Sequence, residues 1–483
     1  MVSCRGSDAK AIVRILTERF MVSSLSVASL LGVAGFAFAL KDGRFRNLNL
    51  FSGRNEDAGD DSFLVPGLQN LGNNCFLNVI LQALASCKDF RSFLQWVLED
   101  AREEDDEQLP LTFALSSLLK ELSKVGRRQS VSNPRNVMSA LTDYVRNFNL
   151  TSQQDAAEAL LHLISSLQEE IVGCYRPTNS SNLSDIMFSR NLRMVAPSEG
   201  LHGLIELKRW HKHLRGPFDG ILGSTLMCRI CSSQISLEFQ FFHTLSLSPL
   251  LHPGGGSNIM FGCTLENCLK KFLDAEKVEN YFCHRCWHGA ALKYLTVTGA
   301  AETDIEKLKS CSGEDQCDCK TSLHLERMPW SNSYSHILKQ LIIARFPKLL
   351  CIQVQRASLD MFGESVKLTG HIAFPLVLDL SLFTPSSIGL NIENIQMSEY
   401  QKPETSSNSG MYYRLVTVVE HFGRTGSGHY TVYRSVRVAS ESEEGEEDCE
   451  DVSWFSISDS EVSRVSESDV LGAEASLLFY ERL

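Results

Sequence analysis

The chain carries no excess of basic residues. Its 46 Lys and Arg are outnumbered by 58 Asp and Glu, which gives a net charge of −12 over 483 residues. Proteins that neutralise the phosphates of nucleic acid need the opposite balance. The composition therefore argues against nucleic acid as the main partner, and it suits a basic protein segment as a ligand.

A regular cysteine framework is also missing. The 15 cysteines are an odd number spread along a long chain, unlike the dense, paired cysteines of small secreted domains. We expect a reducing compartment in which the thiols are free or bound to metal. With 43% hydrophobic residues the chain can bury a large core, sufficient for one multi-lobed domain with appendages.

One cysteine lies where a protein mounts a nucleophile. A turn-prone run ends on Cys75 and continues into the apolar repeat VILQALAS, which predicts a helix that begins at the thiol. The unpaired N–H groups and the positive end of the helix dipole favour thiolate, the form that attacks carbonyls. The side-chain N–H of Asn70 and the backbone N–H of Cys75 are candidate donors to an oxyanion. Cys87, at the end of the apolar repeat, is interpreted as a small buried hydrophobe.

A thiolate nucleophile needs a histidine, and the best candidate is His429 in the run GSGHYTVY. The glycines allow backbone and substrate to approach closely, and the alternating residues after His429 predict a strand that holds its imidazole. Wide separation along the chain is usual for Cys–His enzymes. The competing candidate is His421, at the end of the preceding apolar strand, which is otherwise a hydrogen-bonded structural histidine.

Two CxxC pairs indicate a metal site. Their members are Cys228, Cys231, Cys283 and Cys286. Four thiolates arranged in this way suit a closed tetrahedral Zn(II) site with a structural role. The alternatives are two disulfides or a degraded ribbon that is held by packing alone.

A second group of cysteines occurs in the polar stretch KLKSCSGEDQCDCK. It contains Cys311, Cys317 and Cys319. The polar composition indicates a surface insertion, and a second metal site is the less favoured alternative.

Together these motifs resemble the ubiquitin-specific proteases, papain-like cysteine peptidases that cleave after the C-terminal glycine of ubiquitin. The segment around Cys75 is similar to the family's cysteine box, residues 428–430 to its histidine box, and residues 153–158 to its QQDAHE helix. Further similar segments follow in family order: PFDG, PKLLCIQVQR, FP with LDL, and the terminal LLFYER. The resemblance covers residues 65–483.

Four positions depart from the family pattern. Asn74 replaces the usual threonine, Phe76 the usual tyrosine, and Ala157 the histidine of QQDAHE. None of these changes removes a reacting atom. The fourth departure is the residue that orients the imidazole.

The family normally has Asp or Asn four residues after a strand tryptophan, and the residue four after Trp454 is Ser458, followed by Asp459. A serine hydroxyl can accept the Nδ1–H of His429 and fix its tautomer, although it stabilises an imidazolium less than a carboxylate would. Successive strand residues point to opposite faces, so we expect Asp459 near the oxyanion or in solvent.

The resemblance implies an α+β papain-like fold with a helical thumb, zinc-ribbon β fingers and a β palm. The division of the catalytic domain is thumb 65–215, zinc fingers 216–299, insertion 300–335 and palm 336–483. The family binds ubiquitin on the fingers and threads its Gly-Gly tail through a cleft between thumb and palm.

Two acidic residues, Asp155 and Glu158, match the family's contacts to arginines in the ubiquitin tail. They are one helical turn apart and so lie on one face. A charge pair that only favours the helix dipole is the alternative.

The N-terminal region contains an uncharged run, residues 20–40, between a tail (1–19) and a polar linker (41–64). The run is long enough to cross a bilayer as a helix. We expect a transmembrane anchor, similar to that of the mitochondrial outer-membrane branch of the ubiquitin-specific proteases. The ending Ala37-x-Ala39 leaves a cleaved secretory signal as the alternative, but export would place the catalytic thiol in an oxidising space.

The sequence therefore predicts a cysteine-type deubiquitinase with structural Zn(II). Its substrates are ubiquitinated proteins at a membrane, with the catalytic domain in the cytosol at the mitochondrial outer membrane or another cytosol-facing membrane. Two alternatives remain. One is a catalytically weak or dead ubiquitin-binding scaffold on the membrane, favoured only by Ser458, and the other is a protease for a ubiquitin-like modifier.

Overall fold

The structure is a computed structural model. It describes residues 64–101, 109–145, 149–174, 216–254, 256–311, 317–360, 362–383, 411–438 and 451–483. The predicted tail, membrane anchor and all but the last residue of the predicted linker lie outside these ranges. Within the described ranges, no helix is long and apolar enough to cross a membrane.

Helices form the region predicted as the thumb. They are α2 (Cys75–Ser86), α3 (Lys88–Ala101), α4 (Pro110–Leu122), α5 (Arg135–Thr142) and α6 (Ala156–Cys174). In α2, eleven of the twelve residues are buried. A helix enclosed on every side is confined to the interior, so the packing around α2 fixes its position.

The palm is an eight-stranded sheet in the order β15-β14-β13-β12-β16-β8-β5, with β11 paired to β12. Its strands are β5 (Thr244–Leu247), β8 (Leu349–Val354), β11 (Val377–Asp379), β12 (Tyr412–Arg424), β13 (Ser427–Val438), β14 (Asp451–Ser458), β15 (Glu461–Val465) and β16 (Ala475–Arg482). Alternate residues face opposite sides: Leu477 and Phe479 join the core around α2, whereas Leu478 and Tyr480 join a second core with α9 (Leu265–Leu273).

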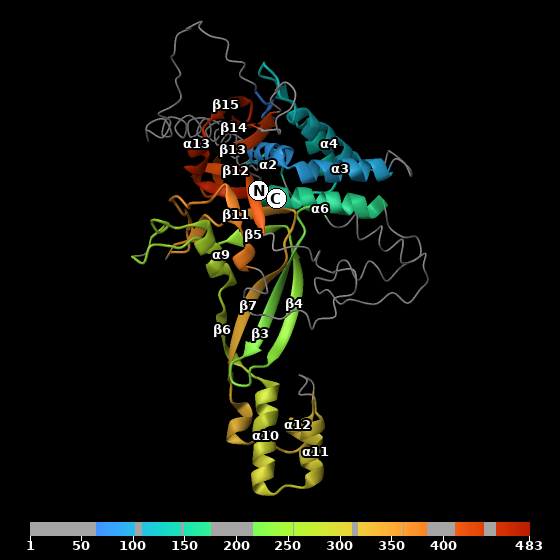
Figure 1. The fold of residues 1–483 in the computed structure, drawn as a ribbon, viewed down its shortest axis with the longest axis vertical. Helices are drawn as coiled ribbons and strands as arrows, with labels where there is room; N and C mark the ends of the chain where they lie inside the picture. Colours follow the sequence, from blue (N-terminus) through green and yellow to red (C-terminus); the bar gives the residue numbers. More distant parts are fainter. Residues whose placement is uncertain are drawn as a thin grey trace, which may run out of the picture. The chain divides into compact units, whose positions relative to one another are not determined.

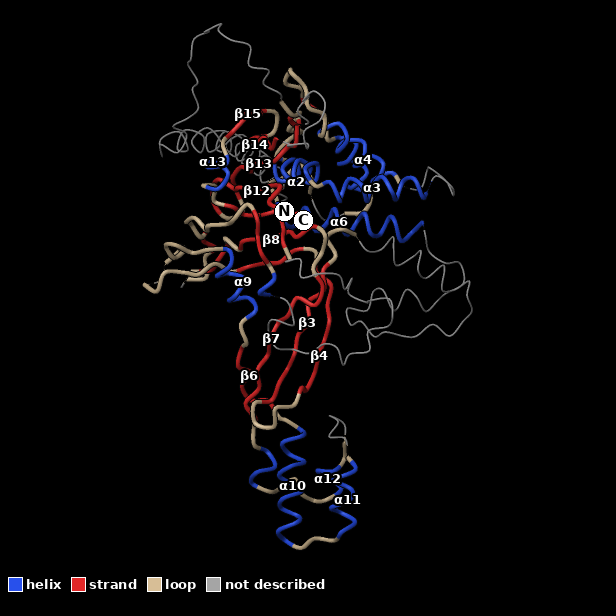
Figure 2. Tube along the Cα trace, in the orientation of Figure 1, coloured by secondary structure: helices blue, strands red, loops and turns tan. Residues whose placement is uncertain are grey.

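A separate four-stranded antiparallel sheet forms the fingers, in the order β4-β3-β7-β6. These strands are β3 (Gly220–Cys228), β4 (Gln234–Phe242), β6 (Glu276–Tyr281) and β7 (Ser335–Arg345). Figure 2 shows them running side by side. The shorter elements are β1 (Gly67–Leu68), β2 (Val131–Ser132), β9 (Ala357–Leu359), β10 (Ser365–Lys367), η3 (Ser381–Phe383) and α13 (Glu467–Leu471).

The predicted linear division into fingers and palm differs from the pairing of the strands. β7 falls in the predicted palm but pairs with β3 of the finger sheet. β5 falls in the predicted fingers but pairs with β8 of the palm, as the one parallel neighbour in that sheet. Such partners are far apart in sequence, and local patterns of hydrophobicity do not reveal them.

The predicted surface insertion, residues 300–335, is largely helical and has a core. Its helices α11 (Glu302–Ser310), α12 (Cys319–Ser322) and η2 (Pro329–Asn332) pack with α10 (His284–Thr298) (Figure 1). The fingers are therefore not purely β. Trp287, Ala291 and Leu295 lie four residues apart on α10 and are buried, a helical pattern that the sequence already contained.

A buried arginine connects α2 to the palm. Arg434 of β13 is 2% exposed. Its Nη1 donates to Gln82 Oε1 at 2.7 Å and to the Leu122 carbonyl at 3.0 Å, and its Nε donates to Ser86 Oγ at 3.1 Å. Burial lowers the pKa of Arg434 to about 9. The guanidinium of Arg434 donates to oxygens of neutral groups on α2 and at the end of α4. These hydrogen bonds stabilise its buried charge.

We expect Arg434→Ala to lower the free energy of unfolding by about 3 kcal/mol or more, because it leaves buried acceptors without a donor and opens a cavity. Arg437→Ala is the matched control, since Arg437 lies three residues further along β13 and is exposed. The control should lose less than about 1 kcal/mol. Urea denaturation of both variants measures the difference, and equal losses would contradict this role of Arg434.

Candidate active site and zinc centre

The candidate nucleophile lies at the start of a buried helix. α2 begins at Cys75, as the sequence predicts, and Asn74 is its N-cap residue. The Asn74 side chain is fully buried and holds the preceding turn, because its Oδ1 accepts the Leu71 N–H at 2.6 Å. The Cys75 side chain is only 5% exposed.

The pKa of the Cys75 thiol is raised, chiefly because burial disfavours the thiolate. The backbone N–H of Tyr430 lowers this pKa, the negative charge of Asp459 raises it, and the N–H groups of Phe76 and Cys75 at the helix start lower it. The predicted effect of the helix start is present, but burial outweighs it. The thiol therefore needs a base, and its contact with Tyr430 places the sulfur beside the strand that carries His429.

His429 and Ser458 lie on neighbouring strands, β13 and β14. The Nε2 atom of His429 is 2.8 Å from Ser458 Oγ. The structure thus brings His429 and Ser458 together, as the sequence predicts. The prediction that Nδ1 of His429 makes this contact was wrong, because Nε2 makes it. If Nε2–H is donated to the hydroxyl, Nδ1 keeps a lone pair and is the nitrogen available to take a proton from the thiol.

The competing histidine is poorly suited to be a base. The pKa of His421 is lowered to about 4, chiefly by burial. Electrostatic repulsion from Lys367 and from His429 lowers this pKa further. Its ring packs against Tyr430, with centroids 4.5 Å apart. Gly428 fits beside it only as glycine, because its φ is +154° and an added Cβ would lie 2.0 Å from the Phe422 carbonyl oxygen. These contacts give His421 a packing role on β12 beside the start of β13, which carries His429.

Asp459 contacts Asn70, the candidate oxyanion donor, which is one of the two directions that the sequence predicts, although it lies in the turn after β14 with a φ of +51° and not on the strand. Its carboxylate accepts from Asn70 Nδ2 and from Asn78 Nδ2, both at 2.8 Å. Its backbone carbonyl accepts the Leu68 N–H at 2.7 Å. One amide hydrogen of Asn70 is thereby fixed, which leaves the other available for an oxyanion.

Asn78 is the residue that sequence analysis missed. It is 1% exposed on α2, and Asn74 Nδ2 donates to its Oδ1 at 3.0 Å. The sequence did contain a signal for this role, because Asn78 is a polar residue in a largely apolar helix. A buried side-chain amide needs hydrogen-bond partners.

The acidic pair Asp155 and Glu158 is exposed at the start of α6. Asp155 Oδ1 caps the helix, accepting the N–H groups of Ala157 at 2.8 Å and Glu158 at 3.1 Å. Asp155 therefore caps the helix, and its second oxygen, Oδ2, accepts the Tyr430 hydroxyl at 3.5 Å. Gln153 Nε2 donates to the Gly428 carbonyl at 3.2 Å, which connects this helix start to β13 next to His429.

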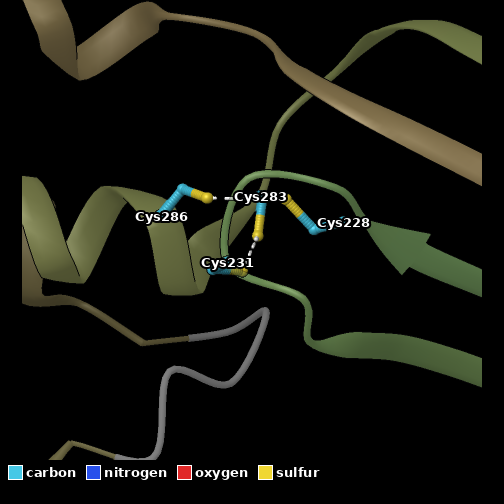
Figure 3. Close-up of side chains that lie close together, drawn as sticks. All are labelled: Cys228, Cys231, Cys283 and Cys286. Carbon is cyan, nitrogen blue, oxygen red and sulfur yellow. Dashed lines mark hydrogen bonds between the residues drawn. The ribbon is translucent and has the colours of Figure 1, made fainter.

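The four cysteines of the CxxC pairs meet where the turn after β3 reaches the start of α10 (Figure 3). All four sulfurs lie within 4.8 Å of one another. The Sγ atoms of Cys228 and Cys286 are 3.5 Å apart, and those of Cys231 and Cys283 are 3.7 Å apart. Zn–S bonds of about 2.3 Å in a tetrahedron place sulfurs about 3.8 Å apart, so the cluster has the dimensions of a structural zinc site.

Comparisons with known proteins agree with this geometry. The model of the family "Ubiquitin carboxyl-terminal hydrolase" matches residues 66–480. The chain belongs to this family. It is 82% identical over 498 residues to ubiquitin carboxyl-terminal hydrolase 27 of Arabidopsis thaliana, covering 100% of both chains. It is 28% identical over 444 residues to ubiquitin carboxyl-terminal hydrolase 30 of Xenopus tropicalis, covering 87% of this chain and 81% of the relative.

The fold of this ubiquitin carboxyl-terminal hydrolase is similar to solved structures. One is the SAGA Ubp8/Sgf11/Sus1/Sgf73 DUB module bound to ubiquitin aldehyde, with a TM-score of 0.53 and 22% identity, covering 86% of this chain and 69% of that one. The predicted papain-like fold of mixed helices and sheets is confirmed, and so is the predicted class of enzyme, a deubiquitinase of the cysteine protease type.

The contact between Ser458 and His429 generates a test. We expect Ser458→Ala to lower kcat about 10-fold or more with little change in KM, because the hydroxyl acts on the imidazole and not on bound substrate. Ser458→Asp should retain activity, since a carboxylate can accept the same Nε2–H. Ser456→Ala is the control on the same face of β14. Steady-state hydrolysis of a fluorogenic ubiquitin substrate measures these effects, and unchanged turnover in Ser458→Ala would refute the assignment.

Proposed function

We propose that this deubiquitinase hydrolyses the isopeptide bond after the C-terminal glycine of ubiquitin, using Cys75 as the nucleophile and His429 as the general base. The observation that carries the proposal is the 2.8 Å contact between His429 Nε2 and Ser458 Oγ. The residue after His429 on β13 is Tyr430, whose backbone lowers the pKa of the buried Cys75 thiol.

In the proposed mechanism, His429 Nδ1 takes the proton of the Cys75 thiol as the sulfur attacks the glycine carbonyl carbon. The carbonyl oxygen becomes an oxyanion, which Asn70 Nδ2 and the backbone N–H of Cys75 stabilise. Protonated His429 then donates to the departing lysine amine and leaves an acyl-enzyme. Water activated by the same imidazole releases the glycine carboxylate and restores the thiol.

The supporting residues have separate parts in this proposal. Ser458 accepts Nε2–H and so keeps the lone pair on Nδ1. Asp459 holds the amide of Asn70 in place through a 2.8 Å hydrogen bond. Asp155 and Glu158 offer exposed carboxylate oxygens at the start of α6 for basic side chains in the ubiquitin tail. Zn(II) held by the four CxxC sulfurs would stabilise the fingers, which in this family receive ubiquitin.

A ubiquitin derivative with a C-terminal electrophile tests the nucleophile. We expect it to label the wild-type chain at Cys75 and to leave Cys75→Ala unlabelled but still bound, because the docking surface is mostly elsewhere. Cys87→Ala is the matched control, since Cys87 is a fully buried thiol whose pKa is raised by that burial. Mass spectrometry identifies the labelled residue.

The same assay separates the alternatives. Binding by the wild-type chain without labelling would favour a ubiquitin-binding scaffold, and labelling only by the probe of another modifier would favour a different substrate. His429→Gln should abolish turnover and His421→Gln should keep most of it; the reverse result would overturn the choice of base.

We also propose that residues 20–40 anchor the enzyme in the mitochondrial outer membrane, with the catalytic domain in the cytosol. The proposal is supported by the length of the uncharged run and by the basic residues at both of its ends, Arg14 and Arg19 before it and Lys41 and Arg44 after it. The substrates would be ubiquitinated proteins at that membrane.

The full chain should remain with mitochondrial membranes after carbonate extraction, whereas a Leu30→Arg/Leu31→Arg variant should be released. Each arginine in the middle of a span costs about 2.5–3.5 kcal/mol of insertion free energy. Asn47→Arg/Asn49→Arg adds the same charge after the run and should stay bound. A chain recovered in a lumenal or secreted fraction, cleaved after Ala39, would show that residues 20–40 are a secretory signal.

A further inference from the structure

Beside the CxxC centre, a second group of metal-binding side chains lies among the helices of the fingers. Its members are His288, Cys311, Cys317 and Cys319, whose ligand atoms lie within 4.8 Å of one another. They lie on or next to three helices: His288 is on α10, Cys311 follows the end of α11, Cys317 precedes α12, and Cys319 begins α12. These helices pack together in Figure 1, and the predicted active site uses none of the four residues.

The histidine is held in the orientation of a metal ligand. His288 Nδ1 is 2.8 Å from the carbonyl oxygen of His284, one turn earlier on α10. A carbonyl only accepts, so Nδ1 carries the proton and Nε2 keeps its lone pair. This is the arrangement by which metal-bound histidines are commonly oriented. Nε2 faces the cysteines, with Cys317 Sγ at 3.4 Å.

The dimensions agree with a tetrahedral zinc ion. Zn–S and Zn–N bonds of about 2.3 and 2.0 Å in a tetrahedron place a sulfur and a nitrogen about 3.5 Å apart, close to the 3.4 Å between Cys317 Sγ and His288 Nε2. His288 is 9% exposed and Cys319 is 2% exposed. Three thiolates with one imidazole are a usual ligand set for structural zinc.

A disulfide explains the group less well. Three cysteines gather here, so one bridge would leave the third thiol beside the histidine without a partner. The imidazole, already oriented by the His284 carbonyl, would have no part in a bridge. In a reducing compartment such thiols remain available to metal.

A crosslink would also stabilise these helices. The buried members of their apolar core are Trp287, Ala291, Leu295, Leu308, Cys319 and Leu325, and partly buried side chains such as Tyr294, Ile305 and Trp330 pack against them. This core is small for a unit of several helices, and a metal ion would add to its stability. One of its members, Cys319, is itself a candidate ligand.

We propose that His288, Cys311, Cys317 and Cys319 bind a second structural zinc ion, distinct from that of the CxxC pairs. Cys286 and His288 are two residues apart on α10, about 200° around the helix axis, so the two sites lie on opposite sides of the same helix. The second ion joins α10, α11 and α12 into one unit.

The test is the zinc content of the full chain, purified in detergent with a reducing agent and no added metal. We expect two zinc ions per chain. Cys317→Ser/Cys319→Ser should retain one ion, and Cys228→Ser should independently retain one. Cys268→Ala is the control, because Cys268 and Cys263 also lie 3.6 Å apart but belong to neither group; it should retain two.

X-ray absorption at the zinc edge tests the wild-type chain and does not depend on whether a variant folds. Two sites with these ligands give one nitrogen for every seven sulfurs, whereas the CxxC site alone gives sulfur only. His288→Asn should remove the nitrogen contribution. A wild-type chain with one zinc ion in an all-sulfur environment, or with a disulfide between two of Cys311, Cys317 and Cys319 under reducing conditions, would overturn the proposal.

Discussion

The burial of α2 against β13 is the constraint on which the active site depends. The helix is enclosed by apolar side chains, and Arg434 of β13 hydrogen-bonds Gln82 and Ser86 on it. A shift of α2 would open cavities, and each large apolar side chain that loses its packing costs about 2–5 kcal/mol. Cys75 at the start of α2 and His429 on β13 therefore keep a fixed relation. Proton transfer between them needs that geometry, because small displacements of reacting groups reduce rates steeply.

The end of β14 and the turn after it add a second constraint. Two adjacent residues there contact different parts of the active site, the general base and the oxyanion donor. Ser458 meets the imidazole, and Asp459 meets Asn70 and Asn78. Asp459 has a φ of +51°, a conformation that aspartate tolerates better than most residues. Gly67 packs so closely on this turn that an added Cβ would lie 2.7 Å from the Ser460 carbonyl oxygen. The groups that orient the base and the oxyanion donor thus share one rigid support.

Much of the site could be predicted because its signals are local. A thiol at the start of an apolar repeat and a histidine after a glycine loop are visible in the sequence, as is the position of Ser458. The contact through Nε2 was not predictable, because it depends on the rotation of the imidazole ring. The pKa of Cys75 depends on burial by distant segments, and Asn78 is paired with a carboxylate 381 residues away. The pairing of β5 with β8 and of β7 with β3 was not predictable for the same reason, because these partners are remote in sequence.

The palm and the helices of the fingers have separate apolar cores. The core around α2 draws on helices and strands from both ends of the described chain. The core of α10, α11 and α12 shares no buried residue with it and has six buried members. A zinc ion held near the start of α10 would remove the mutual repulsion of the thiolates that bind it. On the proposed assignment, order in these helices would therefore depend on metal, whereas the geometry of Cys75 and His429 depends on packing.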